Sequence, residues 1–71
     1  MDDRSVLILE DDGVLCRQLS RCLDRRGFIV TATGSVREFR ASLAASRYAA
    51  VLLDLSLPDG DGVEAWRAGR D

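Results

Sequence analysis

The chain has 71 residues, of which 46% are hydrophobic and 31% are charged, and its net charge is -2. This composition is typical of one small soluble domain, and no basic tail or stripe argues for a direct nucleic-acid partner. The sequence contains no His, which excludes histidine-based catalysis and histidine metal ligands, and its positive residues are all Arg. No apolar run approaches the ~20 residues of a membrane span, and the first residues lack the pattern of a signal peptide. We therefore expect a cytoplasmic protein without a membrane partner.

The first part of the chain predicts a strand, a helix and a second strand. Residues 6–9 form a continuous β-prone apolar run. Asp12 can cap the helix that follows, with arginines on one side and with an apolar face made of Leu15, Leu19, Cys22 and Leu23. Gly27 is placed to end this helix, and residues 28–32 are rich in β-branched and aromatic side chains. Their slightly polar character predicts a strand at the edge of a sheet.

The second part predicts another helix, a third strand and the start of a last helix. Ser35 and Glu38 match a capping box that opens the helix, whose apolar face holds Val36, Phe39 and Leu43. Residues 49–53 form an apolar run that predicts a strand buried on both faces. Pro58 and the residues after it predict a loop, and Asp61 can cap a final helix that holds Trp66. Strands that alternate with helices predict a parallel sheet built from βαβ units.

Carboxylates follow two of the predicted strands. Glu10, Asp11 and Asp12 come directly after the first strand, and Asp54 comes directly after the third. Because ligands bind beyond the carboxyl ends of parallel strands, we expect Glu10, Asp11 and Asp54 to converge and to leave a gap for a hard divalent cation. Asp12 is interpreted as a helix cap. The alternatives are a solvated turn for Glu10 and Asp11, and a turn cap for Asp54.

Other motifs have structural interpretations. Cys16 and Cys22 lack a metal-ligand spacing and are expected to be buried, reduced thiols. Residues 59–62, Asp-Gly-Asp-Gly, superficially match a calcium loop, but counted from Asp59 the sixth position is Glu64 where an EF-hand needs Gly. Ser56 has no His to activate it as a nucleophile. Trp66 is expected to face a core rather than a partner.

Three segments together resemble the first half of a response-regulator receiver domain of bacterial two-component signalling. They are Val-Leu-Ile-Leu-Glu-Asp-Asp at 6–12, the second strand and its exit at 27–34, and Val-Leu-Leu-Asp-Leu-Ser-Leu-Pro-Asp-Gly-Asp-Gly at 51–62. The resemblance implies a doubly wound parallel sheet of the flavodoxin-like, CheY-like type with strand order 2-1-3-4-5. Residues 1–71 are then expected to be a partial receiver domain, truncated after the third strand and the start of a helix.

The resemblance also implies a site. Asp54 corresponds to the phosphoacceptor, Asp11 to a direct Mg²⁺ ligand, Glu10 to an acidic residue that acts on the metal through water, and Ser56 to a ligand through its backbone carbonyl. The implied phosphodonor is a sensor histidine kinase or a phosphotransfer protein, and the implied output is a regulated process such as transcription. The chain is then not an enzyme beyond Mg²⁺-dependent self-phosphorylation. The family's Ser or Thr after the fourth strand, its Lys after the fifth and its aromatic switch residue have no counterpart in this sequence.

Two alternative functions remain open, and the sequence also predicts how the chain associates. A degenerate receiver could act only as a protein-interaction module. A haloacid-dehalogenase-like phosphatase also uses strand-end aspartates, but its Asp-x-Asp motif would place an acid where Ser56 stands. Without a fourth strand, residues 51–55 become an exposed apolar edge, a template for pairing with another chain. We therefore expect the 71-residue chain to be poorly folded or associated through its third strand, most simply as a homodimer.

Overall fold

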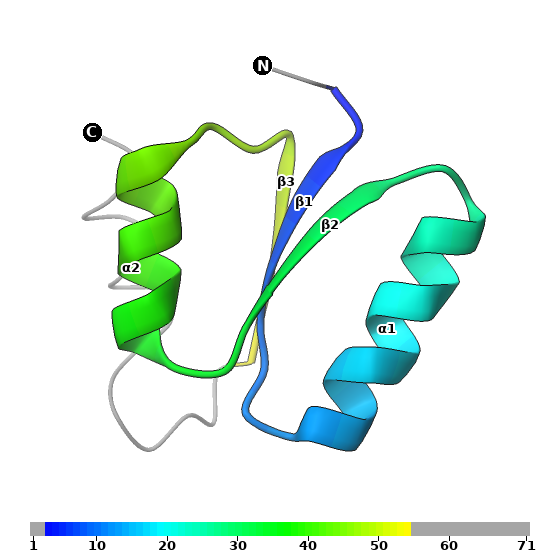
Figure 1. The fold of residues 1–71 in the computed structure, drawn as a ribbon, viewed down its shortest axis with the longest axis horizontal. Helices are drawn as coiled ribbons and strands as arrows, with labels where there is room; N and C mark the ends of the chain where they lie inside the picture. The colour runs from blue at the N-terminus through cyan, green and yellow to red at the C-terminus, as the bar shows by residue number, and fades with distance from the viewer. Residues whose placement is uncertain (1–2, 55–71) are drawn as a thin grey trace.

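Three parallel strands with a helix on each side make up the described part of the chain. The computed structural model describes residues 3–54 (Figure 1). In chain order the elements are β1 (Ser5–Leu9), α1 (Gly13–Arg25), β2 (Ile29–Thr33), α2 (Val36–Ala45) and β3 (Ala50–Leu53). This order confirms the predicted alternation of strands and helices as far as the third strand.

The strands lie in the order β2-β1-β3. β1 pairs in parallel with β2, from Ser5 opposite Ile29 to Leu9 opposite Thr33, and in parallel with β3 through its last four residues. β1 is therefore central, and all five of its residues are buried. The helices cover opposite faces of the sheet, α2 on one side and α1 on the other (Figure 1). The predicted parallel, doubly wound α/β fold class is confirmed.

The side chains of β1 alternate between the two faces, as strand geometry requires. Leu7 and Leu9 form a core cluster with Val36 and Phe39 of α2, and Phe39 and Leu7 are both 0% exposed. Ile8 lies on the opposite face, on the side of α1, and is 1% exposed. Because β1 is buried on both faces, its carboxyl end has a fixed position. The residues that directly follow β1 are therefore held at the end of the sheet.

The predicted caps at the starts of α1 and α2 are confirmed. The carboxylate of Asp12 accepts hydrogen bonds from the N–H groups of Val14 and Leu15, at 3.0 and 3.1 Å. At the start of α2 the Ser35 hydroxyl accepts from the N–H of Glu38 at 3.2 Å, and the Glu38 carboxylate accepts from the N–H of Gly34 at 2.7 Å. The bonds to Asp12 and to Ser35 satisfy N–H groups that a helix start leaves without an intrahelical partner, and the Glu38 carboxylate reaches back to the residue before the cap.

The apolar face of α1 is less buried than its periodicity predicts. No residue of α1 is fully buried, and Leu15 is 41% exposed. The expectation of two buried thiols is wrong: Cys16 is half-buried and Cys22 is exposed, although both are free. Leu15 and Cys22 are seven residues apart and so share one flank of the helix. Among the described residues, nothing covers this flank enough to bury it.

β3 is also only partly buried. Its residues alternate between exposed and half-buried, and Leu52 is 40% exposed. The prediction of a strand buried on both faces is therefore wrong for the described residues. The physical reason is that β3 borders the described sheet and pairs with β1 alone. The prediction that β2 lies at a sheet edge is confirmed.

Several predicted features lie outside the described residues. These are the Ser56 carbonyl, the loop at Pro58 and residues 59–62, and the last helix with Asp61 and Trp66. Within residues 3–54, neither helix has the length and apolar character that crossing a membrane requires.

Candidate functional site

The ends of β1 and β3 bring three carboxylates together. The hydrogen-bond ladder continues one residue past each strand, because the N–H of Asp54 donates to the carbonyl of Leu9 at 2.8 Å and the N–H of Glu10 donates to the carbonyl of Thr33 at 3.0 Å. The ladder therefore fixes the backbone of Glu10 and of Asp54 on neighbouring strands. Both strands run in the same direction, so both side chains emerge at the carboxyl edge of the sheet.

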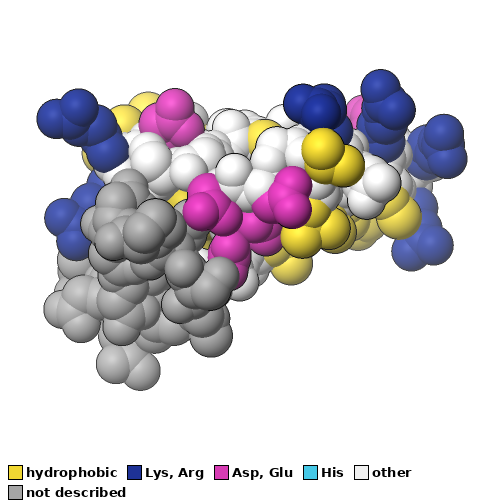
Figure 2. Space-filling view, turned by 90° about the horizontal axis from the view of Figure 1, so that it is seen from below, with side chains coloured by type: hydrophobic (Ala, Val, Ile, Leu, Met, Phe, Trp, Pro, Cys, Tyr) yellow, Lys and Arg dark blue, Asp and Glu magenta, His cyan; other side chains and the backbone are white. Residues whose placement is uncertain are grey.

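Glu10, Asp11 and Asp54 form a group that we call the acidic triad. One carboxylate oxygen from each residue lies within 4.8 Å of the other two. Asp11 is exposed, whereas Glu10 and Asp54 are half-buried. Figure 2 views the molecule from the end at which the strands finish and shows acidic side chains gathered there. The predicted convergence of these three residues is thus present in the structure.

Glu10 is held in place by a backbone N–H two residues further along the chain. The N–H of Asp12 donates to a carboxylate oxygen of Glu10 at 3.1 Å. This bond favours the ionised form and lowers the pKa of Glu10. Desolvation, a hydrogen bond shared with the Asp54 carboxyl, and the charges of Asp54 and Asp11 act in the opposite direction and outweigh it. The net result is that the pKa of Glu10 is raised above its ordinary value.

The donor set of the acidic triad fits a hard divalent cation. All three groups are carboxylates, which are the ligands that Mg²⁺ takes from proteins, and the exposure of Asp11 leaves room for the waters that Mg²⁺ retains. The charges of Asp54 and Asp11, which contribute to the raised pKa of Glu10 after desolvation and the hydrogen bond with Asp54, would also attract a cation. The geometry can hold a cation next to the Asp54 carboxylate.

Two further residues shape the site. Asp12 caps α1 and is not a member of the triad, in agreement with the prediction that it acts as a helix cap. Thr33 was missed by the sequence reasoning: it is 5% exposed, its hydroxyl donates to the carbonyl of Ile8 at 2.6 Å, and its carbonyl accepts from Glu10. Thr33 thus ties the end of β2 to the end of β1, directly below Glu10. A threonine directly after the predicted edge strand, residues 28–32, was the only signal in the sequence.

Comparison with known proteins agrees with this geometry. The sequence model of the response regulator receiver domain matches residues 6–69. The photosynthetic apparatus regulatory protein RegA of Cereibacter sphaeroides is 36% identical over 62 residues, which are 87% of this chain and 34% of that protein. The acid tolerance regulatory protein ActR of Rhizobium meliloti is 39% identical over 72 residues, 97% of this chain and 37% of that protein.

A third relative is named for a different process. The swarming motility regulation protein RssB of Serratia marcescens is 37% identical over 67 residues, which cover 90% of this chain and 31% of that protein. The chain therefore spans about a third of the length of these curated relatives. The match of the family model covers most of the sequence and includes all three residues of the acidic triad. The chain belongs to the response regulator receiver domain family.

Proposed function

We propose that this chain is the phosphoacceptor part of a two-component response regulator. In this proposal Asp54 accepts a phosphoryl group, with Mg²⁺, from a sensor histidine kinase or a phosphotransfer protein. Residues 1–71 then form part of a receiver domain, and the protein that contains them regulates an output such as transcription. The cytoplasmic location expected from the sequence belongs to the same proposal.

The observation that carries the proposal is the placement of Asp54 within the acidic triad. A carboxylate nucleophile that attacks a phosphoryl group faces the repulsion of the phosphoryl oxygens, and the triad adds two more carboxylates. This arrangement is unfavourable for phosphate transfer unless a cation is present. A Mg²⁺ ion bound there would offset this repulsion and orient the phosphoryl group. Asp11 and Asp54 are the residues that would hold it directly, and Glu10 would contact it through water.

In the proposed transfer one bond forms and one breaks. A carboxylate oxygen of Asp54 attacks the phosphorus of a phosphohistidine on the donor protein. The new P–O bond forms as the P–N bond breaks, and the imidazole nitrogen keeps the electron pair and takes up a proton from water. The product is an acyl phosphate on Asp54, the type of intermediate that carboxylate nucleophiles form in other phosphoryl-transfer proteins.

The direct test uses a small phosphodonor. The chain is incubated with acetyl phosphate and Mg²⁺, and its intact mass is measured. We expect the mass of one added phosphoryl group, lost when Mg²⁺ is chelated and lost in Asp54→Ala. Asp12→Asn is the matched control, because it changes a neighbouring acid that lies outside the triad, and it should be labelled normally. Labelling that survives in Asp54→Ala, or that maps to Ser56, would contradict the assignment. A folded chain that is never labelled would favour the interaction-module alternative.

A further inference from the structure

Thr33 holds the carboxyl end of β1 at two points. The register of the sheet sets Thr33 opposite Leu9. Its hydroxyl donates a hydrogen bond to the carbonyl of Ile8 at 2.6 Å, and its carbonyl accepts one from the N–H of Glu10 at 3.0 Å. Thr33 is therefore bonded to β1 on both sides of Leu9, and the second of these bonds ends on a residue of the acidic triad.

The fold by itself does not require a hydroxyl at this position. The side chain of Thr33 is 5% exposed and lies on the same face of β2 as Ile29 and Thr31, because side chains two residues apart share a face. A valine or isoleucine would suit a buried strand position at least as well, and a hydroxyl gives up its bonds to water when it is buried. The parallel ladder also joins β1 to β2 here without any side chain. The bond from the Thr33 hydroxyl is thus an addition to the ladder, made at the end of β2 next to the triad.

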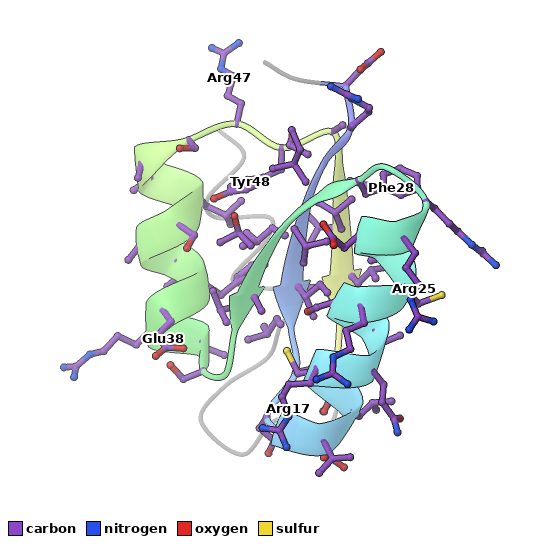
Figure 3. All side chains as sticks on the ribbon, turned by 45° about the vertical axis from the view of Figure 1, so that its right-hand side comes forward. Arg17, Arg25, Phe28, Glu38, Arg47 and Tyr48 are labelled. Atoms are coloured by element: carbon purple, nitrogen blue, oxygen red, sulfur yellow. The ribbon has the colours of Figure 1, made fainter. Side chains whose placement is uncertain are left out.

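The turn that follows Thr33 is fixed from its other side by α2. The N–H of Gly34 donates to the Glu38 carboxylate at 2.7 Å, and Figure 3 shows Glu38 at the start of α2, beside this turn. A Cβ on Gly34 would lie 4.0 Å from the carbonyl oxygen of Glu10, so the turn passes close to the backbone of Glu10. The end of β2 is therefore bonded to β1 on one side and to α2 on the other, and it forms a firm support for Glu10.

Glu10 needs such a support because its charge opposes its position. One carboxylate oxygen of Glu10 lies within 4.8 Å of one from Asp11 and one from Asp54. Like charges at this distance repel each other when no cation is bound. The Asp12 N–H is bonded to the Glu10 carboxylate at 3.1 Å, which orients the end of the side chain but does not fix the backbone from which the side chain starts. The two bonds from Thr33 do fix that backbone, and they limit how far Glu10 can withdraw from the other carboxylates.

We propose that Thr33 is a positioning residue of the acidic triad: its hydroxyl holds the end of β1 so that the Glu10 carboxylate stays beside the other two. Carboxylates that already lie close together before a metal arrives bind it more tightly, because their repulsion has been overcome during folding. Residues that orient metal ligands in this way change metal affinity without touching the metal. The inference rests on the part of the proposed function that places Mg²⁺ at the triad.

The test separates the hydroxyl of Thr33 from the rest of its side chain. Thr33→Val keeps the branched shape and removes the hydroxyl. Thr33→Ser keeps the hydroxyl and Thr33→Ala does not, so this pair isolates the hydroxyl even if the valine variant fails to fold. Thr31→Val is the matched control, because Thr31 is half-buried on the same face of β2 and lies one step farther from the triad.

Each variant of the full chain is titrated with Mg²⁺ while the amide shifts near the triad are followed, and urea unfolding measures stability separately. We expect Thr33→Val to weaken Mg²⁺ binding about tenfold, and Thr33→Ala to weaken it by a similar factor relative to Thr33→Ser. Thr33→Ser and Thr31→Val should stay within about twofold of wild type. In labelling by acetyl phosphate, Thr33→Val should need about ten times more Mg²⁺ for half-maximal labelling and should still reach the wild-type plateau.

A double variant shows whether Thr33 acts through Glu10. In a Glu10→Gln background the carboxylate that Thr33 positions is gone, so adding Thr33→Val should change the Mg²⁺ affinity by less than about twofold. A full effect in that background would overturn the inference. So would equal weakening by Thr33→Val and Thr31→Val, or a loss of stability in Thr33→Val with wild-type Mg²⁺ affinity. A wild-type chain whose amides do not respond to Mg²⁺ would overturn both this inference and the proposed metal site, whereas a chain that binds Mg²⁺ and is never labelled would overturn only the phosphoacceptor role of Asp54.

Discussion

At the scale of single residues, the negative charge of the acidic triad can be neutralised either by a proton or by a bound cation. Glu10 is oriented by the Asp12 N–H and lies close to two other carboxylates, so its charge repels theirs when no cation is bound. Desolvation, the hydrogen bond with the Asp54 carboxyl and this repulsion together raise the pKa of Glu10, against the lowering effect of the Asp12 N–H. A protonated Glu10 would remove the repulsion, and so would a bound Mg²⁺. Protons and Mg²⁺ are therefore expected to compete for the site.

The charge of Glu10 should destabilise the metal-free chain at neutral pH. Because its pKa is raised on folding, the folded state binds this proton more tightly, and the resulting stabilisation is present at low pH and is lost as pH rises through the folded pKa. Glu10→Gln keeps the acceptor for the Asp12 N–H but has no charge. We expect the variant to have a higher Tm than wild type at pH 7 without Mg²⁺, and nearly the same Tm at about pH 4. Mg²⁺ should stabilise wild type more than the variant. An equal difference in Tm at both pH values would show that repulsion is not the cause.

At the scale of elements, α1 packs on the sheet through half-buried side chains and is also fixed at its start. None of its residues is fully buried, yet Asp12 closes its first turn and also orients Glu10. The cap therefore links the position of the helix to the acidic triad. The chain from β1 to α1 does this within four residues, Glu10 to Gly13.

Loss of the cap should weaken the fold without removing the metal site. Asp12→Ala removes the acceptor for the N–H groups of Val14 and Leu15, and loss of such a cap typically costs about 1 kcal/mol of unfolding free energy. Asp12→Asn keeps a side-chain oxygen and should retain most of that stability. Urea unfolding measures both. Mg²⁺ titration followed by amide shifts should give similar affinities for wild type and both variants. A large loss of affinity in Asp12→Asn would mean that Asp12 is a ligand.

At the scale of the whole molecule, the sequence predicted the parts of the fold that follow from local pattern and strand direction. The alternation of strands and helices was readable from periodicity, and the meeting of Glu10, Asp11 and Asp54 followed because parallel strands share a carboxyl edge. The exposure of Cys22 and Leu52 was not readable, because a pattern identifies a face but not what covers it. The role of Thr33 depends on the register between β1 and β2, which no local pattern contains.

The two outer strands of the described sheet differ in a way that bears on assembly. β2 carries polar residues and one exposed large hydrophobic, Ile29 at 50%, whereas β3 is wholly apolar and exposes Leu52 at 40%. Apolar strands at an edge pair readily with other strands, and proteins usually protect such edges with charge or cover. We predict that the 71-residue chain by itself is poorly folded or self-associates through β3, most simply as a homodimer with two-fold symmetry.

Sedimentation and urea unfolding of the 71-residue chain test this prediction. Leu52→Lys places a charge on β3 and should shift the chain toward monomer, because a buried, unpaired lysine disfavours pairing at this edge. Ile29→Lys is the matched control on β2 and should leave the association unchanged. If Ile29→Lys is the variant that dissociates the chain, the contact runs through β2. A wild-type chain that stays monomeric at high concentration and unfolds cooperatively would show that residues 1–71 close their own core, and association through β3 would then be wrong.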